Sequence, residues 1–354
     1  MSNLKINETP VRTSKNYKIN NIVIEKFDIP TRLEKFNGYK ISDLGSKITI
    51  NEKVSKACLK YGLEEFLTKQ VNENANFQAN IVIDSKIHKE AEIDFDIDKS
   101  NSNLVENIEI TANEGTKSTI IIKYETSTDV EAYHNSIIRA KAKKNSKLNI
   151  ILVNLINELS NNFIAIQNEI EENAKINYCI IDLGGKNSIT NYYSNILGDN
   201  ADNKLNTIYV GKNEQKFDLN YIGELYGKKS NIDIEVQGAL KGKAKKNFKG
   251  TIDFKKGCKK ATGNENENCM LLSDTAKSIA LPMLLCSEEE VEGNHSSSAG
   301  KIGEKELFYI MSRGFKQKEA LKLMVRAKFN KIIENIKNEE LKKQIIEEID
   351  KRLD

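Results

Sequence analysis

The chain has 354 residues, 30% of them charged, yet its formal net charge is only +3 because acidic residues nearly balance basic ones. The lysines are scattered among acidic residues, so no basic face of the kind that binds nucleic acid is indicated. No run of about 18 apolar residues occurs and the polar N-terminus lacks the apolar core of a signal peptide, so we expect a cytoplasmic protein without a membrane span.

The N-terminal part of the chain carries few structural signals. The first 20 or so residues are polar, and we expect them to be disordered. Residues 54–72 space their apolar positions three and four apart, which predicts an amphipathic helix. We therefore expect residues 1–77 to form a tail followed by a helical region.

From residue 78 the apolar residues recur with a period of two, which is typical of strands. Runs such as TKSTIIIKY, SKLNIILVN and AKINYCIID each place a small polar residue before a β-rich segment, and they recur about every 28 residues. A second series of strand-like runs lies between them, without helical crossovers. This pattern predicts a parallel β-solenoid over residues 78–302 rather than a sandwich or a βαβ fold. We align the repeats on Lys117, Lys147, Lys175, Lys204 and Asn231, with a possible sixth near Lys259.

Beyond residue 302 the period returns to that of helices. The sequence predicts a short helix that ends at Gly314, a longer helix over residues 316–336, and a third that begins at Asn338 as its N-cap. The C-terminal region 303–354 is therefore expected to be helical. The apolar stripe of the longer helix either docks on the chain's own solenoid or forms a partner-binding cap. The stripe consists of Leu321, Val325, Phe329, Ile332 and Ile336.

No motif for catalysis is present in the sequence. The chain lacks a P-loop, a G-x-S-x-G motif and an H-E-x-x-H motif, and no pair of carboxylates stands out for acid–base chemistry, so we do not expect an enzyme. The five cysteines form no CxxC pair, and we expect free thiols in a reducing cytosol. His88 and His134 lie in strand-like surroundings beside charged residues, and we predict that both are exposed.

Residues 264–315 contain a recognisable order of motifs. An Asn-rich turn leads to Leu271-Leu272-Ser273, and Pro282, an acidic turn, His295 and the run LFYIMSRG follow. In order and spacing this segment resembles the C-terminal signature of the SufB/SufD family, the scaffold proteins of SUF iron–sulfur cluster assembly. With the repeats, the resemblance covers about residues 80–340. It implies a mainly β protein, a right-handed parallel β-helix flanked by helical N- and C-terminal regions.

Within this family the resemblance is closer to SufD than to SufB. SufB carries a cysteine where this chain has Glu267, and a glutamate directly after the histidine, where this chain has Ser296. The chain also departs from SufD, which often has a cysteine at the position of Gly293. Some histidines common in the family are also absent from the repeat over residues 217–227.

The resemblance implies a non-catalytic scaffold subunit that pairs with SufB and binds the SufC ATPase, where ATP hydrolysis is expected. It favours the partner-binding interpretation of the C-terminal helices. ATP-driven dimerisation of SufC would then pull on these helices, strain the SufB–SufD interface and expose residues such as His295. The residues expected to contact partners are Leu307, Phe308, Tyr309, Arg313, Leu321, Val325 and Phe329.

The resemblance places His295 at the heterodimer interface, near a transient iron–sulfur cluster. Neutral imidazole is a competent iron ligand, and small neighbours leave a metal approachable. Alternatively, His295 hydrogen-bonds its turn or its partner and touches no iron. Cys286 is a weaker candidate, because alternation leaves it pointing either to the interface or into the core. The sequence leaves open whether a reduced flavin supplies electrons, and the alternative function is a β-solenoid binding module unrelated to metal.

Overall fold

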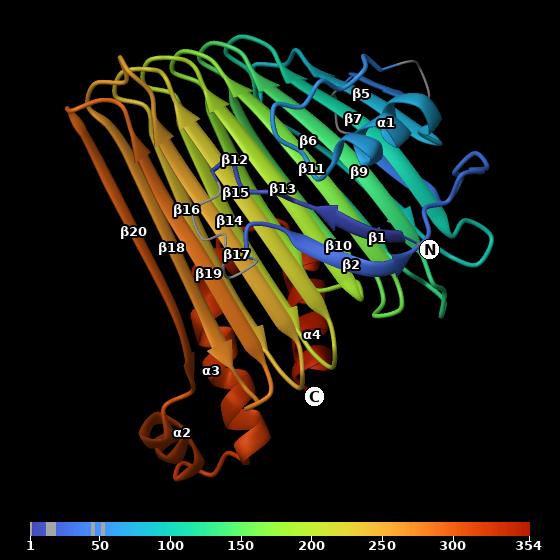
Figure 1. Ribbon diagram of the computed structural model, residues 1–354, viewed down its shortest axis with the longest axis vertical. Coiled ribbons are helices and arrows are strands. Elements are labelled where there is room, and N and C mark those ends of the chain that lie inside the picture. Colours follow the sequence, from blue (N-terminus) through green and yellow to red (C-terminus); the bar gives the residue numbers. More distant parts are fainter. Residues whose placement is uncertain (1, 12–18, 44–46, 51–53) are drawn as a thin grey trace.

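The computed structural model describes residues 2–11, 19–43, 47–50 and 54–354, which form a parallel β-solenoid with helices packed on it (Figure 1). In this described part of the chain, two nine-stranded sheets face each other, and the chain alternates between them. Each coil of the solenoid thus adds one strand to each sheet. The predicted mainly β class and the solenoid architecture are confirmed.

The first sheet ends in β20 and the second sheet ends in β19. The strands of the first sheet, in spatial order, are β3 (Tyr39–Asp43), β6 (Lys89–Asp96), β8 (Lys117–Glu125), β10 (Lys147–Leu155), β12 (Lys175–Asp182), β14 (Asp202–Gly211), β16 (Asn231–Leu240), β18 (Ala261–Leu271) and β20 (Val291–Lys301). The strands of the second sheet are β4 (Lys47–Ile50), β5 (Phe77–Ile83), β7 (Asn103–Ala112), β9 (Tyr133–Ala142), β11 (Asn161–Ile170), β13 (Asn187–Ile196), β15 (Lys216–Leu225), β17 (Lys245–Phe254) and β19 (Lys277–Cys286).

The register of the first sheet corrects one detail of the predicted repeat. Lys117, Lys147 and Lys175 are direct neighbours, as predicted. The next residue in this row is Asp202, whereas Lys204 pairs with Asn177. The alignment on lysines was wrong there by two residues, because the coil between β12 and β14 is shorter than the others and the lysine is not the residue at the turn. The sixth coil aligns at Thr262 rather than near Lys259.

Tight turns with positive φ explain why asparagine recurs in these repeats. Asn145 (φ 61°) and Asn173 (φ 55°) occupy equivalent turns of successive coils, and the N–H of Asn145 donates to the Glu172 carbonyl in the next turn at 3.0 Å. Asparagine and glycine reach this left-handed region at lower cost than other residues. The same turn position is taken in the other coils by Gly115, Asn200, Lys229 and Lys260.

Rows of inward side chains fill the space between the sheets. Residues that pair in register share a face, so each row runs along the solenoid axis. Burial of each such aliphatic side chain contributes roughly 1.5–3 kcal/mol. One row includes Ala91, Ile120, Ile150, Tyr178, Leu205 and Ile234, all of them buried.

The two histidines of the early coils differ in environment. His88 is exposed, as predicted. His134 is fully buried, so the prediction of exposure was wrong for it. Its Nδ1 lies 2.6 Å from Asn162 Oδ1 and its Nε2 lies 3.3 Å from Glu106 Oε1, and the ring packs on Tyr124. Satisfied hydrogen bonds on both ring nitrogens make this burial tolerable.

The N-terminus is ordered where it is described, contrary to the expected disorder. Strands β1 (Ser2–Ile6) and β2 (Ile22–Phe27) pair antiparallel, and Ile6 and Ile24 are buried against the outer face of the second sheet. The Asn7 side chain donates to Asp218 Oδ1 at 2.7 Å. Residues 12–18, which the same expectation covered, lie outside the described residues.

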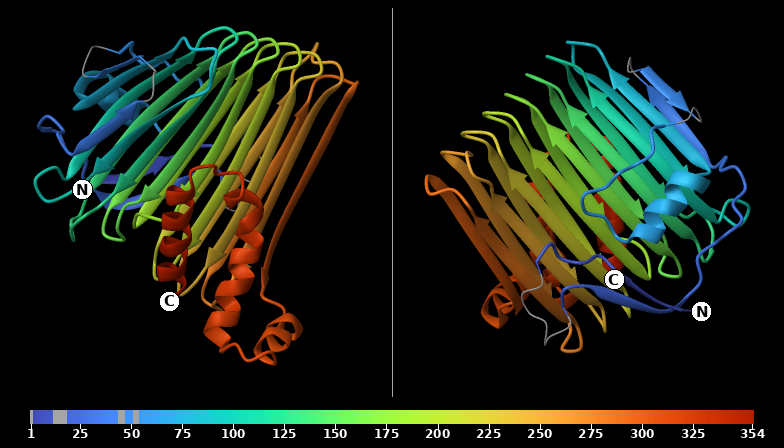
Figure 2. Two further views of the ribbon diagram at one scale, coloured as in Figure 1. Left: turned by 180° about the vertical axis from the view of Figure 1, so that it is seen from behind. Right: turned by 45° about the horizontal axis from the view of Figure 1, so that its top comes forward.

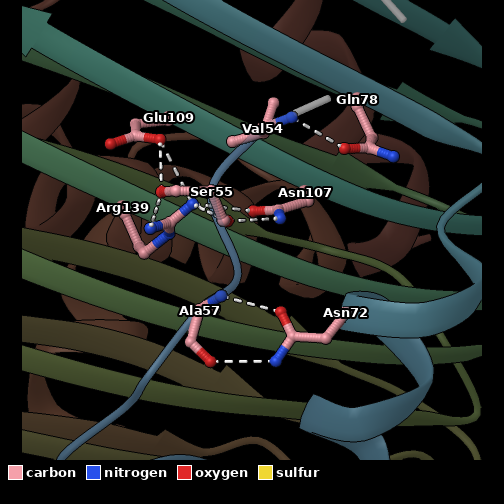
Figure 3. Close-up of polar contacts among 8 residues, drawn as sticks. All are labelled: Val54, Ser55, Ala57, Asn72, Gln78, Asn107, Glu109 and Arg139. Atoms are coloured by element: carbon pink, nitrogen blue, oxygen red, sulfur yellow. Dashed lines mark hydrogen bonds and ion pairs between the residues drawn. The ribbon is translucent and has the colours of Figure 1, made fainter. Parts of the chain in front are cut away.

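Helix α1 (Glu65–Asn74) is shorter than the helix predicted over residues 54–72. Residues 54–57 instead run extended over the second sheet, held by side chains of neighbouring elements (Figure 3). Arg139 donates to the Ser55 carbonyl at 2.7 Å, and the Ala57 N–H donates to Asn72 Oδ1 at 2.7 Å. These tertiary hydrogen bonds override the helical periodicity of the segment.

Three helices follow β20: α2 (Glu304–Met311), α3 (Gln317–Ile333) and α4 (Glu339–Leu353). Gly314, with a φ of 97°, follows α2 as predicted, and Asn338 caps α4 by accepting from the Leu341 N–H. Helices α3 and α4 lie along the outer face of the first sheet (Figure 2). No helix of the described residues is both long and apolar enough to cross a membrane.

Candidate functional site

The two ends of the solenoid differ in how they are covered. At the first end, β3 and β4 pair antiparallel with β6 and β5, and Phe36 is buried beside Phe95. At the last end, no strand of the described residues pairs with the outer edges of β19 and β20 (Figure 1). In β20 all residues from 292 to 301 are exposed. We call this uncovered last coil, β19 with β20, the open end.

His295 lies in the middle of β20, at this open end. It pairs in register with Glu265 of β18, which in turn pairs with Ile234 of β16. The inward row that includes Ile120 is therefore apolar from Ala91 to Ile234 and ends in a carboxyl group and an imidazole. Because register neighbours share a face, His295 belongs to the inward face, and it is exposed only because no further coil covers it.

Glu265 is a buried carboxyl group without a partner. The residue is 2% exposed, and neither side-chain oxygen has a hydrogen-bond partner among the described residues. Its carboxyl group occupies space that a side chain at Gly250 would need, since a Cβ there would lie 2.2 Å from the carboxyl carbon. Burial, and then the negative charge of Glu267, raise the pKa of Glu265 to about 8.

Glu267, two residues further along β18, has a buried cationic partner. Lys246 Nζ donates to Glu267 Oε1 at 2.7 Å, and both side chains are fully buried. The Tyr209 hydroxyl donates to the same oxygen at 3.2 Å, and Ser297 of β20 donates to Oε2 at 2.8 Å. Glu267 thus links the interior to the open end, whereas Glu265 receives no such compensation.

Two cysteines lie near this region, but in different settings. Cys269 is buried one coil below the open end, and burial raises the pKa of its thiol. Cys286 pairs in register with Phe254, a core residue, so it belongs to the inward face, yet it is exposed at the open end. Its Sγ donates to the Glu288 carbonyl at 2.9 Å.

The structure does not assemble a complete metal site from these residues. Among the described residues, no group of three or more His, Cys, Asp or Glu side chains converges as metal ligands. His295 on β20 and Cys286 on β19 both belong to the inward-facing side of the last coil. No third ligand from the described residues converges with them. Further ligands to a metal at the open end would have to come from water or from another chain.

Helix α2 carries a second exposed surface. None of its residues is buried; Phe308 is 73% exposed and Tyr309 57%, and the Arg313 guanidinium stacks on the Tyr309 ring at 4.6 Å. Only Ile302 and Gly303 separate α2 from β20, so this surface is joined directly to the open end. We call Leu307, Phe308, Tyr309 and Arg313 the α2 surface.

The remaining residues predicted to bind a partner lie on α3, and they are less accessible than those of the α2 surface. Val325 and Phe329 are fully buried in a cluster with first-sheet residues such as Ile151 and Ile181. Leu321 is half-buried. This packing matches the alternative of docking on the chain's own solenoid, and a partner could reach Val325 and Phe329 only by displacing the helix. Val325 and Phe329 are therefore not part of an accessible docking surface.

Sequence reasoning missed Glu265 and Lys246. The run NENENC does contain a signal, because strict alternation puts the glutamates on one face and the asparagines on the other. Since both faces are polar, the pattern alone does not tell which one points inward. The register does: the asparagines face out, where Asn264 bonds to Asn294 and Asn266 to Ser296.

Comparison with known proteins identifies relatives of the chain. A family model described as the SufBD core domain of SUF-system FeS cluster assembly matches residues 95–328, about two thirds of the chain. The iron–sulfur cluster assembly protein SufD of Bacillus subtilis is 27% identical over 180 residues, 51% of this chain and 41% of that protein. SufD of Escherichia coli is 23% identical over 241 residues, 68% of this chain and 57% of that protein.

A SufBD family protein of Pyrococcus horikoshii is 27% identical over 233 residues, 65% of this chain and 50% of that protein. The chain thus spans about half the length of these relatives. None of these matches favours the alternative of a binding module unrelated to metal.

Proposed function

The chain belongs to the SufB/SufD family of SUF iron–sulfur cluster assembly proteins, and we propose that it acts as a SufD-like, non-catalytic scaffold subunit. In this proposal it pairs with a SufB-type chain and binds a SufC-type ATPase. ATP hydrolysis takes place on the ATPase, and the iron–sulfur cluster is cargo that is built at the heterodimer interface and passed on. The cytoplasm is the proposed compartment, which the five free cysteines support.

The open end of the solenoid is the observation that carries this proposal. An exposed strand edge offers a row of N–H and C=O groups to another chain, and proteins normally cover such edges. Here the first end is covered by β3 and β4, while β20 is exposed along nearly its whole length. This asymmetry supports a partner that adds to the last coil by strand addition. His295 would then lie at the interface.

The proposed role of His295 is to ligate iron during cluster assembly. Imidazole nitrogen is a suitable donor for iron, and the small residues Ser296 and Ser297 leave room around it. Since the described residues form no complete ligand group, the partner chain would supply the other ligands. Cys286, exposed on the same coil, is a second candidate donor in this proposal.

The proposed coupling to the ATPase runs through α2. The α2 surface is apolar, exposed and rich in aromatic side chains with an arginine, which is the composition of binding hot spots. Movement of α2 would be transmitted to β20 through the two connecting residues, Ile302 and Gly303. Dimerisation of the ATPase would thereby strain the interface and open it for iron and sulfur.

Co-expression with the SufB-type and SufC-type proteins of the same genome tests this function. The proposal predicts that affinity purification and size-exclusion chromatography yield one stable complex that contains all three chains. Recovery of this chain alone, with both partners well expressed, would contradict it. As a control, the α1 variant Phe66→Ala changes an exposed residue far from the open end and should leave the complex intact.

A further inference from the structure

The carboxyl group of Glu265, on β18 next to the open end, is a group that the proposed function does not use. It is buried, both of its oxygens are without a hydrogen-bond partner in the described part of the chain, and Gly250 opposite leaves the room it occupies. A buried carboxyl group whose two oxygens both lack a hydrogen-bond partner is costly in either protonation state, so a group that the free chain lacks would compensate it when bound. Lys246 does not serve, because it is engaged by Glu267.

The register of the sheet indicates which neighbour can share a cation with Glu265. Its neighbour in β16 is Ile234, which is apolar, and its neighbour in β20 is His295. Adjacent strands lie about 4.8 Å apart, and oxygen and nitrogen donors bind transition metals at about 2 Å, so the two side chains can converge on one ion. A carboxylate and an imidazole together are a donor set for divalent transition metals.

We propose that Glu265 and His295 form a two-ligand site for a divalent transition-metal cation at the open end. The ion enters from the open end, because His295 is the exposed member of the pair. Water, or the partner chain after docking, completes the coordination. The identity of the ion as ferrous iron rests on the proposed function, whereas the site itself rests on the geometry.

The site can be tested on the full chain purified alone, with Co²⁺ as the probe in a calorimetric titration. We expect one Co²⁺ per chain, and at least a tenfold loss of affinity in Glu265→Gln and in His295→Ala. Glu292→Gln is the matched control, since Glu292 is an exposed carboxylate on β20 that lies on the outward face, and it should bind like the unmodified chain. Thermal unfolding of each variant checks that the fold is intact.

Two results would overturn the proposal. One is the absence of stoichiometric Co²⁺ binding to the unmodified chain. The other is Co²⁺ binding by Glu265→Gln that equals binding by the unmodified chain. If this variant also no longer captures the SufB-type partner, the carboxylate pairs with a cationic side chain of that partner instead. Failure of the proposed function is distinguishable, because it would leave Co²⁺ binding by the lone chain unchanged while no ternary complex forms.

Discussion

His295 and Glu265 are register neighbours on β20 and β18, and both belong to the face that points into the solenoid. Through this pair, the inward face of β18 continues onto the exposed strand β20. The apolar row beneath them stabilises the fold, and polar residues replace it only in the last two strands of the sheet, β18 and β20. The two proposed ligands therefore lie at the end of the solenoid that the described residues leave uncovered.

The packing of α3 on the first sheet predicts which C-terminal residues matter for stability. Phe329→Ala should lower the free energy of unfolding by about 3–5 kcal/mol, because it removes a fully buried aromatic ring. Leu323→Ala, on the same helix but 44% exposed, should change it by no more than about 0.5 kcal/mol. Urea unfolding of both variants measures the difference, and equal effects would contradict the assigned packing.

The α2 surface predicts a separate effect on partner binding. Phe308→Ala and Tyr309→Ala should each weaken capture of the SufC-type ATPase at least tenfold, because exposed aromatic residues with an adjacent arginine dominate such contacts. Their unfolding free energies should stay unchanged, since neither side chain is buried. Surface plasmon resonance gives the affinity, with Phe66→Ala as the control. Full capture by both variants would exclude α2 as the docking helix.

The buried ion pair of Lys246 and Glu267 predicts that removing the lysine strongly lowers stability, and that removing the charge of Glu267 as well restores much of it. Lys246→Met should destabilise the chain by about 3–5 kcal/mol, because it leaves Glu267 as an uncompensated buried charge. The double variant Lys246→Met with Glu267→Gln should recover a large part of this loss. Thermal unfolding of the single and double variants measures it. If the double variant were less stable than Lys246→Met, the loss would not arise from the unpaired charge.

The contacts of Glu224 on β15 predict that the segment around Lys60 is held to the second sheet by a pH-dependent interaction. Its carboxylate accepts from Lys60 Nζ at 2.5 Å and from the Tyr193 hydroxyl at 2.7 Å, and it lies 3.1 Å from Lys255 Nζ. Burial alone would raise the pKa of Glu224, but the hydrogen bonds and charges of these partners outweigh it and lower the pKa from 4.5 to about 2. A lowered pKa stabilises the folded state above the unfolded-state pKa, and this contribution is lost as the pH falls towards 2.

Glu224→Gln should therefore be less stable than the unmodified chain by about 2 kcal/mol at neutral pH, and the difference should shrink between about pH 5 and pH 2. Unfolding by urea at several pH values gives this difference. Hydrogen exchange near Lys60 should also rise in the variant. A difference that does not depend on pH would mean that Glu224 contributes through shape rather than charge.

The sequence was informative where local pattern and structure coincide. The repeat period identified the solenoid, and the helical stripes identified α3 and α4, because both patterns are set by burial of one face. The local pattern was insufficient where tertiary contacts decide. Residues 54–57 run extended because side chains such as Arg139 and Asn72 hold their backbone. His134 is buried because partners on other strands satisfy both of its nitrogens.

The candidate site was only partly accessible to sequence reasoning. The motif order pointed to His295, since the resemblance includes that position. Glu265 could not be identified, because its importance comes from the register with His295 and from the missing side chain at Gly250, which lies on the opposite sheet. The shift from Lys204 to Asp202 in the aligned row has the same cause, since register depends on turn lengths in three dimensions.

The central claim is that the outer edge of β20 is the surface on which the partner chain docks. Hydrogen–deuterium exchange of the chain, alone and in complex with the SufB-type protein, tests it most directly. We predict strong protection of the β20 amides, residues 291–301, on complex formation, while the covered first end around β3 and β4 stays unchanged. Protection confined to other segments, with β20 exchanging as in the free chain, would contradict the account.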